Sequence, residues 1–239
     1  MHKHKQCFGT VFVYNVGMTG RLFISALIKY FSGVILLWLL LFPLGGTDWP
    51  DACIFMGVLF IPMFIAGLVM MAKDPGLLKE RLDMKERESE QKTVILISGI
   101  LFLLVFVLAA LNHRYGWLHF PVWVRRAAAV IFLVAYAGYA EVLRENRWLS
   151  RTVKVQEGQK VVDAGMYGIV RHPMYAVTVW LFLSMPVMLD SPLSFVIMLG
   201  YIPVIVKRIL NEEKVLRREL KGYEEYMQKV KYRLIPMIW

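Results

Sequence analysis

Long apolar blocks separated by short polar segments dominate the pattern of this chain. The first block covers residues 22–42 and contains one charged residue, Lys29, whereas the blocks at residues 52–72 and 93–112 contain none. A fourth block, at residues 122–143, carries charges only near its two ends. An α-helix needs roughly 20 apolar residues to cross the hydrocarbon core of a bilayer. The pattern therefore predicts four membrane-spanning helices in this part of the chain.

Two shorter apolar blocks follow, at residues 174–189 and 192–206, and only Asp190 and Ser191 separate them. As a helix, each block would cover only about 24 Å, which is less than the thickness of the hydrocarbon core. Prolines lie near their ends, where they bend or terminate helices. We therefore expect a tight helical hairpin whose arms either lengthen into the interface or stop short of a full crossing.

The predicted fold class is an all-α, polytopic membrane bundle of about five to six helices, including the C-terminal hairpin, with a cytosolic C-terminal helix. A polar tail (residues 1–20) precedes the N-terminal membrane helices (residues 21–143). These helices enclose a cytosolic, amphipathic loop at residues 73–92. Residues 144–239 form a region made of a loop, the hairpin (residues 173–206) and the C-terminal helix.

Composition and charge support this interpretation and orient the chain. Hydrophobic residues make up 58% of the sequence, above the 45–50% of a soluble domain, which argues against a soluble enzyme. The two cysteines cannot form a disulfide framework or the CxxC spacing of a zinc site. Lys and Arg concentrate in residues 73–92, 144–171 and 207–233, which the positive-inside rule places in the cytosol with both termini.

One polar segment ends in Arg171, His172 and Pro173, directly before an apolar helix. Proline suits the first turn of a helix, where its missing N–H costs nothing. An Arg and a His at a helix N-terminus together form a site for a carboxylate or phosphate. The alternative is an interfacial anchor, because Arg and Tyr are common at membrane boundaries.

A second polar segment directly follows the hairpin. Arg208 and Glu212 are four residues apart, so they share one face of a helix, and Glu213 lies beside them. Ionisable groups this close to the bilayer suggest function, although a solvated helix with ordinary ion pairs is the alternative. Glu145 and Asn146, at the end of the fourth block, either face a polar cavity or mark a plain membrane exit.

In order and spacing these motifs resemble the isoprenylcysteine carboxyl methyltransferase family of integral membrane enzymes, whose C-terminal half is shared by phospholipid N-methyltransferases. The resemblance covers about residues 145–236, from GMYGIVRHPMY and the hairpin through R-x-x-x-EE-x-x-L and GYEEY to a closing RLIP. It implies that S-adenosylmethionine binds on the cytosolic side, between the loop before Arg171 and the C-terminal helix. It implies neither a metal nor a nucleotide fingerprint.

The resemblance also implies roles for individual residues. The cofactor-binding positions are Gln156, Gln159, Lys160, Val161, Val162, Tyr167, His172, Pro173, Met174, Tyr175, Glu212 and Glu213, of which Gln156 is the loosest match. Arg208 matches the arginine assigned to the substrate carboxylate. We expect Arg171 as a second catalytic residue, and Glu145 and Asn146 beside the substrate.

The sequence thus predicts a membrane methyltransferase that moves a methyl group from S-adenosylmethionine to a lipid-linked or membrane-embedded acceptor. The carboxylate of a prenylcysteine is the family's reference acceptor. It is ionised at pH 7, so the enzyme has only to desolvate it and hold both reactants in line. The expected partners are the bilayer and a lipophilic or prenylated substrate, with no nucleic acid and no metal.

Three other functions stay open at this point. A phospholipid amine N-methyltransferase would need a base to take a proton from the amine, and Glu145 or Glu213 is the candidate. A sterol-reductase-like membrane reductase would bind NADPH in the corresponding region. A non-catalytic membrane scaffold would bind neither cofactor.

Overall fold

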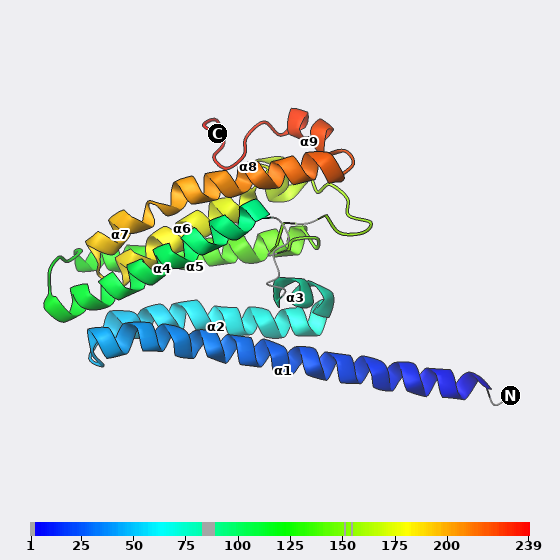
Figure 1. The fold of residues 1–239 in the computed structure, drawn as a ribbon, viewed down its shortest axis with the longest axis horizontal. Helices are drawn as coiled ribbons and strands as arrows, with labels where there is room; N and C mark the ends of the chain where they lie inside the picture. Colours follow the sequence, from blue (N-terminus) through cyan, green and yellow to red (C-terminus); the bar gives the residue numbers. More distant parts are fainter. Residues whose placement is uncertain (1–2, 83–88, 151, 154) are drawn as a thin grey trace.

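The computed structural model describes residues 3–82, 89–150, 152–153 and 155–239, and this part of the chain is helical, without strands (Figure 1). The helices are α1 (Lys3–Gly45), α2 (Pro50–Lys73), α3 (Pro75–Leu82), α4 (Ser89–Tyr115), α5 (Val122–Glu145), α6 (Pro173–Met188), α7 (Pro192–Met198), α8 (Tyr201–Glu219) and α9 (Tyr223–Lys229), with a 3₁₀ turn, η1 (Gly165–Gly168), between α5 and α6. The long helices lie side by side, and α3 and α9 lie toward the same end of the bundle (Figure 1).

Among the described residues, five helices are long and apolar enough to cross a membrane. They are Gly20–Gly45 of α1, all of α2, Gln91–Tyr115 of α4, all of α5, and Pro192–Glu219, which joins α7 to α8. Large apolar side chains on these helices point outward, and Val134, Leu96 and Ile61 are each more than 60% exposed. Such a surface is typical of contact with lipid. The predicted all-α polytopic bundle is confirmed, and the protein is an integral, multi-pass membrane protein.

The backbone differs from the predicted boundaries at two places. Helix α1 begins at Lys3, within the segment assigned to a polar tail, and no proline interrupts it before Pro43. The second hairpin arm breaks at Leu199 and Gly200 and then continues as α8 to Glu219, well past residue 206. The last part of the hairpin arm (residues 201–206) and the predicted C-terminal helix are therefore one helix, α8.

This continuity fixes the position of the polar residues on α8. Ile205 and Ile209 are buried in the bundle, and the Gln91 side chain of α4 donates a hydrogen bond of 3.2 Å to the Arg208 carbonyl oxygen. Helix α5 packs closely against α6 at Gly138, since a Cβ atom on this residue would lie only 3.0 Å from the Val177 side chain. The start of α6 and the middle of α8 are thus held together at one end of the bundle.

The opposite end of the bundle contains a polar cluster around the hairpin turn. Asp190 adopts a left-handed conformation (φ 57°), and its carboxylate accepts hydrogen bonds of 2.7 Å from the Phe120 backbone N–H and from His119 Nδ1. Arg125 forms ion pairs with Asp51 and, at 3.5 Å, with Asp190. An arginine on the predicted outer side is therefore neutralised by two carboxylates.

Candidate functional site

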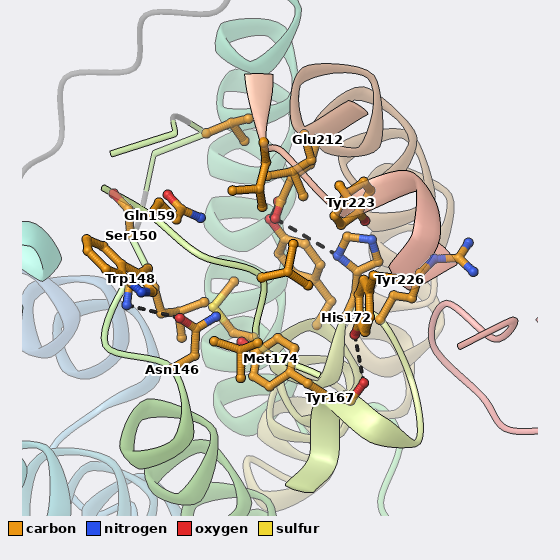
Figure 2. Close-up of a pocket in the computed structure, with 18 of the residues that line it drawn as sticks. Asn146, Trp148, Ser150, Gln159, Tyr167, His172, Met174, Glu212, Tyr223 and Tyr226 are labelled. Carbon is orange, nitrogen blue, oxygen red and sulfur yellow. Dashed lines mark hydrogen bonds and ion pairs between the residues drawn. The ribbon is translucent and has the colours of Figure 1, made fainter. Parts of the chain in front are cut away.

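A polar pocket lies where the start of α6, the middle of α8, α9 and the loop after α5 meet (Figure 2). Its lining residues are Asn146, Trp148, Leu149, Ser150, Thr152, Val153, Gln159, Lys160, Val161, Val162, Tyr167, Arg171, His172, Met174, Tyr175, Arg208, Glu212, Leu216, Leu220, Tyr223 and Tyr226. Residues from both polar segments identified in the sequence, the one that ends at Pro173 and the one that begins after the hairpin, therefore line this pocket.

The η1 turn forms one wall, and Glu145 holds it in place. Both carboxylate oxygens of Glu145 accept a hydrogen bond from the Met166 backbone N–H, at 3.1 and 2.9 Å. Gly165 has a positive φ of 59°, and a Cβ atom on it would lie 1.8 Å from Glu145 Oε1. On the far side of the turn, the Tyr226 hydroxyl donates a 2.7 Å hydrogen bond to the Tyr167 carbonyl oxygen. These contacts place the Tyr167 ring against the pocket.

The substitution Gly165→Ala is expected to lower the free energy of unfolding by more than the ~1–2 kcal/mol that left-handed backbone costs a residue with a Cβ atom. The excess arises because the new methyl group overlaps the Glu145 carboxylate. Thermal unfolding of the purified protein in detergent measures the effect.

Gly158→Ala is the matched control, because Gly158 also has a positive φ (73°) but nothing lies within 4 Å of the position that a Cβ atom would take there. Adding Glu145→Ala to Gly165→Ala is expected to recover the steric part of the loss. Equal losses for the Gly165 and Gly158 variants would contradict the packing described for η1.

Arg171 connects the start of α6 to the C-terminal segment. It is 5% exposed, its Nε donates to Glu213 Oε1 at 2.8 Å, and its Nη1 donates to the Val230 and Lys231 carbonyl oxygens, each at 2.8 Å. The Arg171 backbone N–H donates to the Tyr232 carbonyl oxygen at 2.9 Å. One part of Arg171 lines the pocket, but its guanidinium is held by this internal network.

Glu213 lies at the centre of the same network and outside the pocket lining. Its side chain is 4% exposed. Besides Arg171, it contacts Arg233 Nε at 3.0 Å and His172 Nε2 at 3.4 Å. A buried carboxylate needs such partners to offset its desolvation. Glu213 therefore fixes the His172 ring and the C-terminal segment relative to α8.

Glu212, in contrast, faces the pocket. Its side chain is 22% exposed, and its Oε1 lies 4.0 Å from His172 Nδ1 (Figure 2). Its Oε2 accepts a 2.5 Å hydrogen bond from the Tyr175 hydroxyl, which in turn accepts a 2.9 Å hydrogen bond from Arg208 Nε. The Arg208 guanidinium also lies 5.8 Å from the centroid of the Tyr175 ring. The predicted pair Arg208 and Glu212 is thus linked through one tyrosine.

Aromatic hydroxyls complete the pocket. Burial raises the pKa of Tyr167, Tyr223 and Tyr226 above the ordinary phenol value, so all three keep their protons at neutral pH. Within the part of the chain that the structure describes, the buried Tyr223 hydroxyl has no hydrogen-bond partner. A buried polar group of this kind is costly unless a ligand or water satisfies it. The pocket therefore suits a ligand rich in hydrogen-bonding groups.

Most of the site residues predicted from the sequence meet in this pocket. Those that line it are Asn146, Gln159, Lys160, Val161, Val162, Tyr167, Arg171, His172, Met174, Tyr175, Arg208 and Glu212. Four others lie next to it without lining it: Gln156, Pro173, Glu145 and Glu213. The Gln156 side chain donates to the Trp148 carbonyl oxygen at 2.7 Å and shapes the loop, and Pro173 begins α6.

The sequence interpretation did not include several lining residues. They are Trp148, Leu149, Ser150, Thr152, Val153, Leu216, Leu220, Tyr223 and Tyr226. Tyr223 and Tyr226 belong to the GYEEY motif, which is part of the family resemblance, and this motif is the sequence signal that could have identified them as pocket residues.

The described residues include no cluster of three or more His, Cys, Asp or Glu side chains that could hold a metal ion.

Comparison with known proteins supports the family resemblance. Residues 127–218 match the model of the isoprenylcysteine carboxyl methyltransferase (ICMT) family, which confirms the resemblance drawn from the motifs. Over 91 residues, 37% of this chain, the sequence is 29% identical to the Delta(14)-sterol reductase TM7SF2 of Mus musculus. That match spans only 22% of the reductase's length.

A solved structure extends the comparison to the whole fold. The eukaryotic intramembrane Ras methyltransferase ICMT (isoprenylcysteine carboxyl methyltransferase) superposes with a TM-score of 0.56, covering 99% of this chain and 87% of that chain. Sequence identity is 17%, so this likeness concerns the fold.

Proposed function

We propose that this protein is a membrane methyltransferase that uses S-adenosylmethionine, because residues 127–218 match the model of the isoprenylcysteine carboxyl methyltransferase family. The acceptor is lipid-linked, and the accepting group is a carboxylate of the prenylcysteine type. The observation that carries the proposal is the chain of contacts from His172 through Glu212 and Tyr175 to Arg208, inside the region that matches the family.

The pocket residues fit the polar groups of S-adenosylmethionine. Glu212 has a partly exposed carboxylate that accepts hydrogen bonds from an ammonium group or from ribose hydroxyls. The start of α6, with His172, favours a carboxylate. The Tyr223 hydroxyl needs an acceptor, and the ligand's oxygen and nitrogen atoms supply one. When bound there, the cofactor supplies a methyl group on an electrophilic sulfonium sulfur.

The residues of the chain then have to position the acceptor and exclude water. Arg208 orients the acceptor carboxylate, and the Tyr175 hydroxyl, 2.9 Å from Arg208 Nε, fixes the guanidinium. A carboxylate is already ionised at neutral pH, so the reaction needs no general base. Tyr175 is 5% exposed, so the centre of this arrangement is shielded from bulk water.

An apolar cavity supports a lipid-linked acceptor. It has a volume of about 420 Å³ and lies between α1, α2, α3, α5 and α6. Apolar side chains dominate its lining, among them Leu59, Met63, Phe132 and Leu181. A cavity of this size and character suits an alkyl or isoprenoid chain better than a polar ligand. The lipid part of the acceptor would occupy this cavity, while its polar end reaches the pocket.

The match to a sterol reductase favours a second candidate, a membrane reductase that binds NADPH in the same pocket. The two candidates differ in the ligand they require. Saturable binding of S-adenosylhomocysteine supports the methyltransferase, whereas saturable binding of NADPH alone supports the reductase.

Arg208→Ala is expected to lower methyl transfer at least 100-fold while leaving the affinity for S-adenosylhomocysteine within about threefold, since Arg208 acts on the acceptor and orientation makes a large contribution to rate. The assay follows transfer of the labelled methyl group from S-adenosylmethionine to N-acetyl-S-farnesylcysteine in detergent.

Lys207→Ala serves as the matched control, because Lys207 is the exposed neighbour on the same helix and lies outside the pocket. It is expected to retain the activity of the unmodified protein. Full activity of Arg208→Ala would remove Arg208 from the acceptor site.

A further inference from the structure

Helix α3 presents one arginine to the interior of the bundle. Leu77 and Leu78 are buried and anchor the helix, and the Asp74 carboxylate accepts a 3.0 Å hydrogen bond from the Leu77 backbone N–H at its start. Lys79 points outward and is exposed, whereas Arg81 lines the apolar cavity. The same short helix thus places one cation outside and one inside.

Arg81 lies where the apolar cavity approaches the polar pocket. Its guanidinium lies 5.4 Å from the centroid of the Tyr139 ring, which also lines the cavity. Its Nη1 lies 4.0 Å from Met174 Sδ, and Met174 lines the polar pocket. Met174 directly precedes Tyr175, the residue that links Arg208 to Glu212. Arg81 therefore lies on the apolar-cavity side of Met174, whereas Arg208 lines the polar pocket.

The charged residues among the described lining of the cavity are both cationic. Lys29 and Arg81 are its cationic lining residues, and the described residues that line it include no Asp or Glu. Lys29 Nζ donates a 2.5 Å hydrogen bond to the Leu82 carbonyl oxygen, which holds it against the end of α3. In low-dielectric surroundings, two cations favour an anionic group and repel an ammonium group. The described lining charges therefore favour an anionic end group on a bound lipid.

We propose that Arg81 is a specificity-determining residue that binds the carboxylate end of the acceptor on its lipid side. It thereby selects an acceptor that ends in a carboxylate over one that ends in a neutral or cationic group. Binding is charge-assisted and leaves one carboxylate oxygen for Arg208, and the contact with Tyr139 pre-orients the Arg81 guanidinium. This inference rests on the proposed function, since it assumes that the apolar cavity receives the acceptor.

The test compares binding of two probes of nearly equal size and shape, N-acetyl-S-farnesylcysteine and its uncharged carboxamide, by calorimetric titration of the detergent-purified protein. The unmodified protein is expected to bind the acid at least tenfold more tightly than the carboxamide. Arg81→Ala and Arg81→Gln are expected to lose this preference, and Arg81→Lys to keep part of it. Lys79→Ala, on the same helix, is expected to keep all of it.

Two results would overturn the inference: no preference for the acid in the unmodified protein, or an undiminished preference in a folded Arg81→Gln variant. Thermal unfolding identifies the folded variants, and Arg81→Gln and Arg81→Lys preserve most of the side-chain volume. Failure of the proposed function is a separate result, because it appears as absent binding of S-adenosylhomocysteine. In the Arg81 variants that affinity is expected to stay within about twofold.

Discussion

Replacing Arg171 by methionine is expected to lower the free energy of unfolding by about 3–5 kcal/mol, the usual cost of removing one partner of a buried ion pair. The substitution leaves the Glu213 carboxylate, 4% exposed, without its closest cation. It also removes the donors to the Val230 and Lys231 carbonyl oxygens, which hold the C-terminal segment on α6. Thermal unfolding in detergent measures the loss.

Arg217→Met is the control for this substitution, since Arg217 is exposed on α8 and its loss is expected to cost less than about 1 kcal/mol. A stability of Arg171→Met close to that of the control would show that the network around Glu213 contributes little. In that case Arg171 would be free to act on the ligand directly.

Replacing Glu212 by glutamine is expected to weaken binding of S-adenosylhomocysteine at least tenfold, and up to about a hundredfold, because a hydrogen bond to a charged group contributes about 1.5–3 kcal/mol. The amide keeps the shape of the side chain but loses the negative charge that faces the pocket. It also replaces one acceptor oxygen with a donor nitrogen. Calorimetric titration of the purified variant gives the dissociation constant.

Glu219→Gln tests whether loss of any carboxylate on α8 has the same effect, since Glu219 is exposed at the end of that helix and lies outside the pocket. Its affinity is expected to match that of the unmodified protein. An unchanged dissociation constant for Glu212→Gln would exclude Glu212 from the cofactor site.

The bundle was predictable from the sequence because membrane crossing depends on the length and polarity of single segments. The apolar blocks alone predict the four spans and the hairpin, without knowledge of which helices pack together in the fold. The continuity of α8 was less accessible, because the boundary at residue 206 marks a change in polarity and not the end of a helix. Charged residues continue a helix as readily as apolar ones.

The pocket was predictable where several chemical groups share one local motif. Arg208 and Glu212 lie on one helical face, and His172 precedes the helix that carries Tyr175. These arrangements depend only on the spacing of residues within one helix or next to it, and this spacing can be read directly from the sequence.

The division of roles between Glu212 and Glu213 was not predictable in the same way. It depends on the C-terminal segment, which folds back so that Arg233 reaches Glu213. The engagement of Glu145 with η1 likewise joins residues 21 positions apart. Contacts of this kind arise from tertiary packing and leave no periodic pattern in the sequence.

The most direct test of the proposed function is a titration of the detergent-purified protein with S-adenosylhomocysteine and, separately, with NADPH. Saturable binding of S-adenosylhomocysteine that Glu212→Gln weakens, together with no binding of NADPH, is the predicted result. Binding of NADPH alone, or of neither ligand, would contradict the assignment of the pocket to S-adenosylmethionine.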